Sequence, residues 1–149
     1  MEASLIEPSR WGMDHWSTFC YLGHAFHKSG GEPDRNKMRC KPGSPRMGYF
    51  IAMLSESHDT TVCKYPTRLN DGTAIPFHDD YDCADDVIAA GLLTNTGTGM
   101  HPSYTLTPAG LTVWSYICRT RPTSWSMKSL TVDEIAREMP ATRLPCPLV

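Results

Sequence analysis

Residues 83–93 have the sequence CADDVIAAGLL, and residues 104–110 have the sequence YTLTPAG. In the first stretch, aspartates near the beginning and Gly91 just after the end predict a helix at 83–90. Carboxylates stabilise the positive end of a helix, and glycine readily adopts the left-handed conformation that ends one. The first stretch therefore completes one helix, and the second stretch leads into another.

The second helix is predicted at 108–118, because Thr107 is a typical N-cap and Pro108 suits the first helical position. Short strands are expected between the two helices, at 92–94 and 104–106, joined by a glycine-containing turn. The apolar residues expected to form the buried stripe of the second helix are Leu111, Trp114, Ile117 and Cys118.

Residues 82–121, with this helix, wing-like turn and helix, resemble the second half of a winged-helix domain of the MarR type. The resemblance is carried by Ala90-Gly91-Leu92-Leu93 and by Leu106-Thr107-Pro108-Ala109-Gly110. It implies a helix–wing–helix unit and, in members that bind DNA, a helix before the wing that enters the major groove. Because unrelated proteins reuse folds, the resemblance predicts a local shape better than a function.

A helix at 14–28 is expected before this unit, with Asp14 as its N-cap and Gly30 at its end. Its expected buried stripe is Trp16, Phe19, Cys20, Gly23 and Phe26. The Asn70-Asp71-Gly72 sequence, with short apolar flanks, predicts a hairpin. A capping box from Thr131 to Glu134 opens a short C-terminal helix at 131–139.

The chain has 149 residues and is expected to form a single domain, 1–149, of the α+β class. We describe it as a small winged-helix-like domain with an added N-terminal helix and a short C-terminal helix. The first residues lack the pattern of a signal peptide, and no apolar run is long enough to cross a membrane. The six cysteines are widely spaced with no CxxC, which favours reduced thiols and a cytoplasmic protein with no membrane association.

The residues around the first helix of the winged-helix-like unit are acidic, and the chain has no Lys or Arg between Arg68 and Arg119. We call the five carboxylates there the acidic edge: Asp79, Asp80, Asp82, Asp85 and Asp86. They would repel the phosphates of DNA, so this helix is not expected to read a DNA groove. The acidic edge is instead the expected contact surface for a protein partner.

Basic residues gather in a polar stretch at 32–46, the basic loop. The residues that could contact phosphates there are Arg35, Lys37, Arg39, Lys41 and Arg46. The loop supports an alternative hypothesis of DNA or RNA binding, although the formal net charge of −2 lacks the basic excess of most nucleic-acid binders. An ordinary solvated loop would have the same composition.

His78 and Cys83, with the neighbouring aspartates, offer nitrogen, sulfur and oxygen donors within a few residues, which could bind a divalent metal such as zinc. The simpler interpretation is that the aspartates cap a helix and Cys83 faces the core, so no cofactor is expected. Cys20, His24 and His27 lie along one side of the N-terminal helix and could hold a metal, but packing at the edge of the buried stripe gives the same spacing and is the favoured interpretation.

No motif in the chain is specific enough to name a catalytic activity, which favours a non-enzymatic protein. Segments 14–19, 65–69 and 78–83 also resemble a group of uncharacterised phage and bacterial proteins. Our hypothesis is a phage-encoded protein-interaction or regulatory module that acts on a host nucleic-acid-handling or defence complex through the acidic edge. The alternatives are a winged-helix regulator that binds DNA or RNA, and a metal-dependent hydrolase built around His78 and Cys83.

Overall fold

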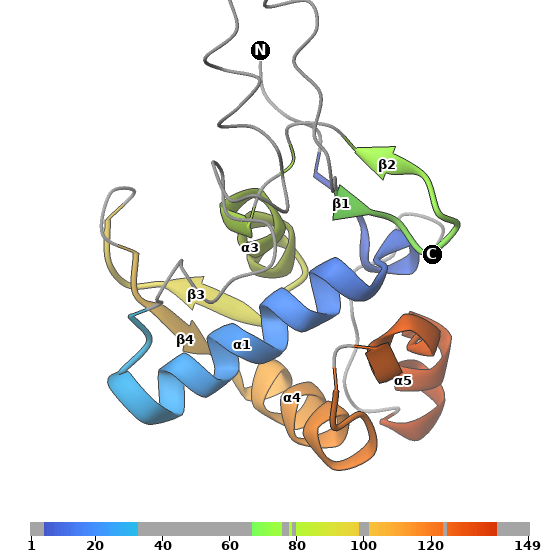
Figure 1. Cartoon of the computed structure of the whole chain (residues 1–149). Helices are drawn as coiled ribbons and strands as arrows, with labels where there is room; N and C mark the ends of the chain where they lie inside the picture. Colours follow the sequence, from blue (N-terminus) through green and yellow to red (C-terminus); the bar gives the residue numbers. More distant parts are fainter. Residues whose placement is uncertain are drawn as a thin grey trace, which may run out of the picture.

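The computed structural model describes residues 5–32, 67–75, 78, 80–98, 102–123 and 125–139, which form an α+β fold (Figure 1). Its helices are α1 (Met13–Ser29), α3 (Asp80–Ala89), α4 (Pro108–Thr120) and α5 (Val132–Glu138), with short 3-10 helices η1 (Pro8–Arg10) and η4 (Trp125–Ser129). Two antiparallel hairpins complete it: β1 (Thr67–Arg68) with β2 (Ala74–Ile75), and β3 (Leu93–Asn95) with β4 (Tyr104–Leu106). The expected α+β class is confirmed.

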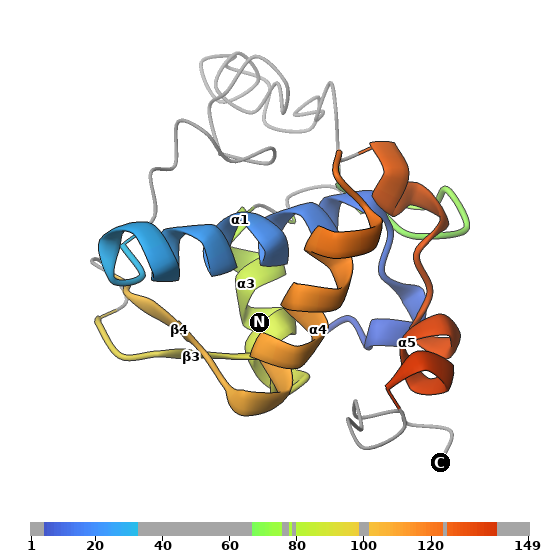
Figure 2. The same cartoon turned by 90° about the horizontal axis from the view of Figure 1, so that it is seen from below.

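Helix α1 is the central element of the core. It contacts α3, α4, β4, η4 and β1, and Figures 1 and 2 show it running between α3 and α4. Trp16, Phe19 and Leu22 on this helix are fully buried. A helix surrounded on several sides buries residues around most of its surface, and in α1 these include polar residues of its N-terminal half, among them Asp14 and His15.

The N-terminal end of α1 differs from the sequence-based prediction. Gly12 is the N-cap residue, and the Asp14 side chain lies inside the first turn. There the Asp14 Oδ2 accepts a hydrogen bond from the Arg68 amide at 3.1 Å. A Cβ on Gly12 would lie 2.7 Å from the Arg68 carbonyl oxygen, so a larger residue would push β1 away. The C-terminal end is as predicted, with Gly30 in the left-handed conformation (φ 74°).

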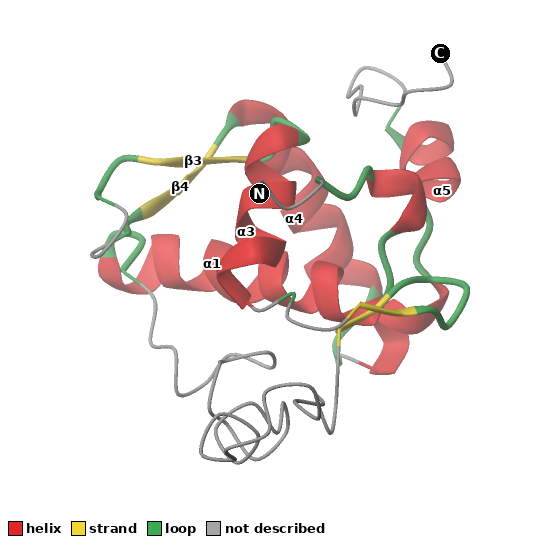
Figure 3. Cartoon of the chain, turned by 90° about the horizontal axis from the view of Figure 1, so that it is seen from above, coloured by secondary structure: helices red, strands yellow, loops and turns green. Residues whose placement is uncertain are grey.

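The hairpin predicted around Asp71 is confirmed. Strands β1 and β2 pair through Thr67 with Ile75, and Gly72 takes a positive φ of 90° in the turn. The Asn70 amide donates to the Arg10 carbonyl at 3.0 Å, which fastens the hairpin to η1. Figure 3 shows this hairpin and the β3–β4 hairpin on opposite sides of the helices.

The α3–β3–β4–α4 segment follows the predicted order, with small shifts in boundaries. Strand β3 begins one residue later than expected, and its Leu93 pairs with Leu106 of β4. Gly91 ends α3 with a φ of 82°. Thr107 is the N-cap of α4 and accepts a hydrogen bond from the Gly110 amide at 2.9 Å.

The buried face of α4 is rotated from the predicted stripe. Leu111 is 45% exposed, whereas Gly110, Val113 and Ile117 are buried. The cause is the close approach of α4 to the residue before β3: the Gly110 backbone packs directly on the Leu92 carbonyl, so the Gly110 side of the helix faces the core. Trp114 and Cys118 lie half-buried at the edge of this face.

Thr131 caps α5 as predicted, with its hydroxyl accepting from the Glu134 amide at 3.1 Å. The other half of the predicted capping box is wrong. The Glu134 carboxylate instead accepts hydrogen bonds from Tyr116 and, at 2.6 Å, from Arg121. This half-buried network holds α5 against the end of α4, which a bond within one turn of α5 could not do.

Two further expectations concern the basic loop and the absence of a membrane-spanning helix. Nearly all of the basic loop, from residue 33 onward, lies outside the described residues. Within the described part of the chain, no helix has the length and apolar character needed to cross a membrane.

We predict that Gly110→Ala destabilises the fold, because a Cβ at this position would collide with the Leu92 carbonyl oxygen. Overpacking of this kind costs about 1–3 kcal/mol, and rigid backbone on both sides places this site near the upper end. Urea unfolding followed by tryptophan fluorescence measures the change. Thr112→Ala, on the exposed face of the same helix, should change the free energy of unfolding by less than about 0.5 kcal/mol. Equal stability of the two variants would contradict the packing described here.

Candidate functional site

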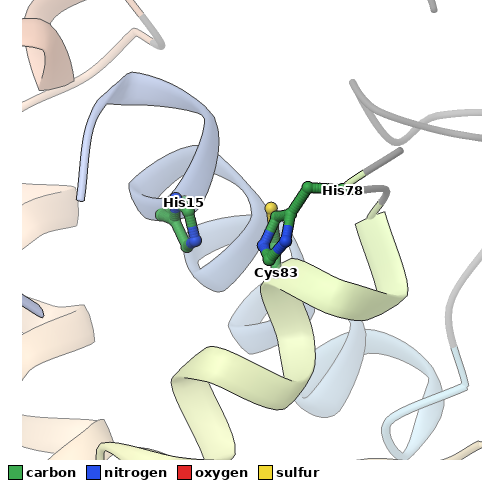
Figure 4. A group of neighbouring side chains, drawn as sticks. All are labelled: His15, His78 and Cys83. Atoms are coloured by element: carbon green, nitrogen blue, oxygen red, sulfur yellow. The ribbon is translucent and has the colours of Figure 1, made fainter. Parts of the chain in front are cut away.

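Three potential metal-binding side chains meet between α1 and α3. His15 comes from the first turns of α1, His78 precedes α3, and Cys83 lies in α3. One ligand atom from each residue lies within 4.8 Å of the other two. Figure 4 shows the two imidazole rings and the Cys83 sulfur converging on one small region. All three side chains are buried, with residue exposures between 0 and 5%.

The carboxylate of Asp86 joins the two histidines. Its Oδ2 lies 2.7 Å from the His15 Nε2 and 2.7 Å from the His78 Nε2. Its Oδ1 accepts a hydrogen bond from the Ile6 amide at 2.9 Å. Asp86 is 1% exposed, so one buried carboxylate is shared by three partners from the segment before α1, from α1 and from the segment before α3. We refer to His15, His78, Cys83 and Asp86 as the buried cluster.

Helical periodicity explains how α3 contributes to this cluster. Cys83, Asp86, Val87 and Ala90 recur at three- and four-residue steps, and all four are buried. The inward face of α3 therefore carries one thiol and one carboxylate. His78, outside the helix, is positioned through its backbone, since its carbonyl accepts from the Thr67 hydroxyl at 2.5 Å.

The opposite side of the cluster is closed by Trp11. Its indole ring stacks on the His15 imidazole with ring centroids 5.5 Å apart and an interplanar angle of 4°. The Trp11 Nε1 donates to the Ile6 carbonyl at 2.9 Å. The N-terminal segment thus both covers His15 and supplies the amide that binds Asp86.

The environment fixes the charges of the two central groups. Burial would raise the pKa of Asp86, but hydrogen bonds from His15, His78 and the Ile6 amide outweigh it and hold that pKa below its usual range. Burial lowers the pKa of His15, although Asp86 opposes the shift. At neutral pH the cluster therefore contains an ionised carboxylate beside a neutral His15 imidazole.

The His15 ring has a second nitrogen, Nδ1, that is buried and has no hydrogen-bond partner among the described residues. An unpaired polar atom in the interior costs about 1–3 kcal/mol. A neutral imidazole nitrogen is also a good ligand for zinc and other transition metals. The cluster therefore keeps donor capacity that the described hydrogen bonds do not use.

The structure brings together the two predicted metal ligands, His78 and Cys83, and adds two residues that the sequence analysis missed. Asp86 was assigned to the acidic edge, and the phase of α3 could have placed it on the inward face with Cys83. His15 lies 71 residues from Asp86, and no local pattern connects the two. Its only sequence signal was its position between Asp14 and Trp16 in a helix with an apolar stripe.

The acidic edge needs a correction. Asp86 is buried in the cluster and does not belong to an exposed surface, because its carboxylate is fully used by internal partners. Asp85 is exposed and Asp82 half-buried. Asp79 and the side chain of Asp80 lie outside the described residues, as do the basic-loop residues Arg35, Lys37, Arg39, Lys41 and Arg46.

We predict that Asp86→Asn lowers the free energy of unfolding by roughly 2–4 kcal/mol. The amide has one acceptor oxygen, which cannot serve both the Ile6 amide and the two imidazoles. Asp85→Asn is a matched control one residue away. Burial and the nearby Asp82 and Asp86 charges raise the pKa of Asp85, so its neutralisation should leave stability unchanged or slightly increased. Similar losses in both variants, measured by urea unfolding, would argue against a special role for Asp86.

Comparison with known proteins gave no matching family model, no similar curated protein and no similar solved structure. The geometry of the buried cluster and the chemistry of the exposed surface therefore carry the functional argument.

Proposed function

We propose that this chain is a zinc-binding, non-enzymatic regulatory module in which the metal ties α1 to α3 on a winged-helix-like scaffold. The observation that carries the proposal is the convergence of His15, His78 and Cys83 on one buried point beside Asp86. His15 lies far in the sequence from His78 and Cys83, so a shared ligand would fix α1 against the N-terminal part of α3.

The donor set favours zinc over other divalent ions. Two imidazole nitrogens and a thiolate suit zinc, whereas calcium and magnesium prefer oxygen ligands. Zinc–nitrogen and zinc–sulfur bonds of about 2.0–2.3 Å place tetrahedral ligand atoms roughly 3.3–3.8 Å apart. Atoms already within 4.8 Å need only small rotamer changes to reach this geometry. Asp86, whose Oδ2 contacts the Nε2 atoms of both rings, would orient the two histidine ligands.

Burial favours a structural role for the metal over a catalytic one. Catalytic zinc sites usually have three protein ligands and an open position for water or substrate. Here the three candidate ligands, His15, His78 and Cys83, have residue exposures between 0 and 5%, so the site offers little access to a substrate. A hydrolase needs an accessible metal, so this burial disfavours the metal-dependent hydrolase that the sequence analysis left as an alternative.

The order of α3, β3, β4 and α4 is that of a helix, a wing and a second helix, which supports a winged-helix-like scaffold. The outward side of α3 carries Asp85 and Asp82, and the helix has no Lys or Arg. Residues 94–98 of the wing are exposed and uncharged. A surface of this kind suits a basic protein partner better than a phosphate backbone.

The zinc proposal predicts one zinc ion per chain in protein purified without chelators, measured by elemental analysis. Cobalt substitution should produce a thiolate-to-metal charge-transfer band that Cys83→Ser abolishes. His15→Ala and His78→Ala should lose the metal, and Asp86→Asn should weaken binding at least tenfold. His24→Ala, an exposed histidine on the same helix as His15, serves as the control and should retain full metal content.

Chelation provides a second readout, because a metal that binds only the folded state adds to stability. Removal of zinc should lower the Tm of the wild type and leave that of Cys83→Ser unchanged. A wild-type protein that takes up no zinc from stoichiometric solution, with a Tm insensitive to chelator, would rule the site out.

The acidic surface gives a separate prediction for nucleic acid. We expect no measurable binding of short duplex DNA by the wild type at physiological salt, and increased binding by an Asp82→Lys/Asp85→Lys double variant, since repulsion of phosphate falls. Fluorescence anisotropy measures both. Tight binding by the wild type would favour the alternative DNA- or RNA-binding function through the basic loop.

A further inference from the structure

A second cluster of reactive side chains lies where α1 and α4 pack together, and the zinc proposal does not use it. Cys20 of α1 is 4% exposed, and Cys118 of α4 is half-buried. Both are free thiols, and each side chain shifts the pKa of the other, as expected for two thiols close together between the two helices. The two cysteines lie 98 positions apart in the sequence (118 minus 20), so tertiary packing alone brings them together.

Trp114 fixes the spacing of the two helices at this point. Its Nε1 donates to the Cys20 carbonyl at 3.1 Å, and its indole ring packs directly against Gly23. Cys118 follows Trp114 by one helical turn and so lies on the same side of α4. The α1–α4 packing thus places Cys118 beside the part of α1 that holds Cys20.

His27 completes the surroundings of the thiols. Its ring stacks on Trp114 with centroids 4.5 Å apart and an interplanar angle of 14°, and its Nδ1 is 2.9 Å from the Gly23 carbonyl. It is exposed to solvent, as is His24, which contacts the edge of the same indole. Cys20 is thus the buried member of the thiol pair, and Cys118 is the half-buried member beside these exposed histidines.

We propose that Cys118 and Cys20 form a dithiol site that hydroperoxides oxidise to a disulfide joining α1 to α4. Cys118 is the attacking residue, because it is the half-exposed member of the pair. Cys20 is the resolving residue, because it is buried on the part of α1 against which α4 packs.

The reaction takes place in two steps. The Cys118 thiolate attacks one peroxide oxygen, the O–O bond breaks, and the departing alkoxide or hydroxide takes a proton to leave as alcohol or water. Cys118 is then a sulfenic acid. The Cys20 sulfur attacks it, its proton combines with the departing hydroxide as water, and the S–S bond forms. Two thiols and one hydroperoxide give one disulfide, one alcohol and one water, with two electrons passing from sulfur to oxygen.

The acidities of the two thiols agree with these roles. The hydrogen bond from Cys20, helped by the His27 charge, lowers the pKa of Cys118 to about 7. The same hydrogen bond raises the pKa of Cys20, and burial adds to this effect. The thiolate is the reactive form, so attack at neutral pH falls to Cys118.

The proposal is tested by treating the purified full-length chain with hydrogen peroxide and mapping cysteine products by mass spectrometry. No Lys or Arg separates Cys83 from Cys118, so trypsin leaves them in one peptide, and a second digestion before Asp85 or Asp86 resolves them. The expected product is an intramolecular Cys20–Cys118 disulfide. Oxidation that leaves Cys118 as a thiol, or that pairs it with a different cysteine, would overturn the proposal.

Two substitutions at Cys20 separate its roles. Cys20→Ser keeps a hydrogen-bond donor but cannot form a disulfide, so Cys118 should stop at a sulfenic acid that dimedone traps. Cys20→Ala also removes the donor, and alkylation of Cys118 at pH 7 should fall roughly five- to tenfold as its thiolate fraction drops. Circular dichroism checks that both variants are folded. Equal alkylation rates in Cys20→Ser and Cys20→Ala would show that the hydrogen bond does not activate Cys118. Cys118→Ser serves as the control for the mass assignment, because this variant must lack the Cys20–Cys118 disulfide.

Discussion

The buried carboxylate of Asp86 is the interaction that holds the segment before α1, α1 itself and the N-terminal end of α3 together. One oxygen binds the Ile6 amide, and the other contacts the Nε2 atoms of His15 and His78. A carboxylate removed from water is costly unless hydrogen bonds replace its hydration. Three donors from three separate segments provide that replacement. The segment before α1, α1 itself and the residue before α3 are thus held to one point, and loss of any one donor would leave a buried charge under-compensated.

This constraint explains why α1 can serve as the central helix. Its N-terminal end is fixed twice, by His15 on Asp86 and by Asp14 on the Arg68 amide. Its C-terminal end is fixed by Gly31, whose carbonyl accepts from the Tyr104 amide at 2.8 Å. Between these ends, Trp16, Phe19 and Leu22 fill the core. Polar contacts set the position of the helix, and apolar burial supplies most of its stability.

The features that the sequence predicted well are local ones. Gly91 and Gly30 end helices because their positive φ suits glycine, and Thr107 caps α4 through a hydrogen bond to an amide three residues away. Each signal lies within one turn of the element it defines.

Predictions failed where tertiary contacts decided the outcome. Leu111 was expected to be buried, but the contact of Gly110 with Leu92 rotates α4 and exposes it. In the site, His78 and Cys83 are neighbours in sequence and were identified, whereas the partnership of His15 with Asp86 depends on the packing of α1 on α3. A carboxylate on the apolar face of α3, in phase with Cys83 and Ala90, was the overlooked signal.

The same cluster links the fold to the proposed metal. Without a metal, the interior must hold an ionised carboxylate, two imidazoles and a thiol, with the His15 Nδ1 lacking a partner among the described residues. Each of these groups loses hydration, and the hydrogen bonds recover that loss only in part. A zinc ion would take the displaced thiol proton's place, neutralise the negative charge and use donor capacity that is otherwise idle. Because the ligands come from segments that meet only in the folded chain, metal affinity and folding stability would then be two measures of one equilibrium. The depressed pKa of His15 acts in the same direction, since a neutral imidazole can bind a metal and a protonated one cannot.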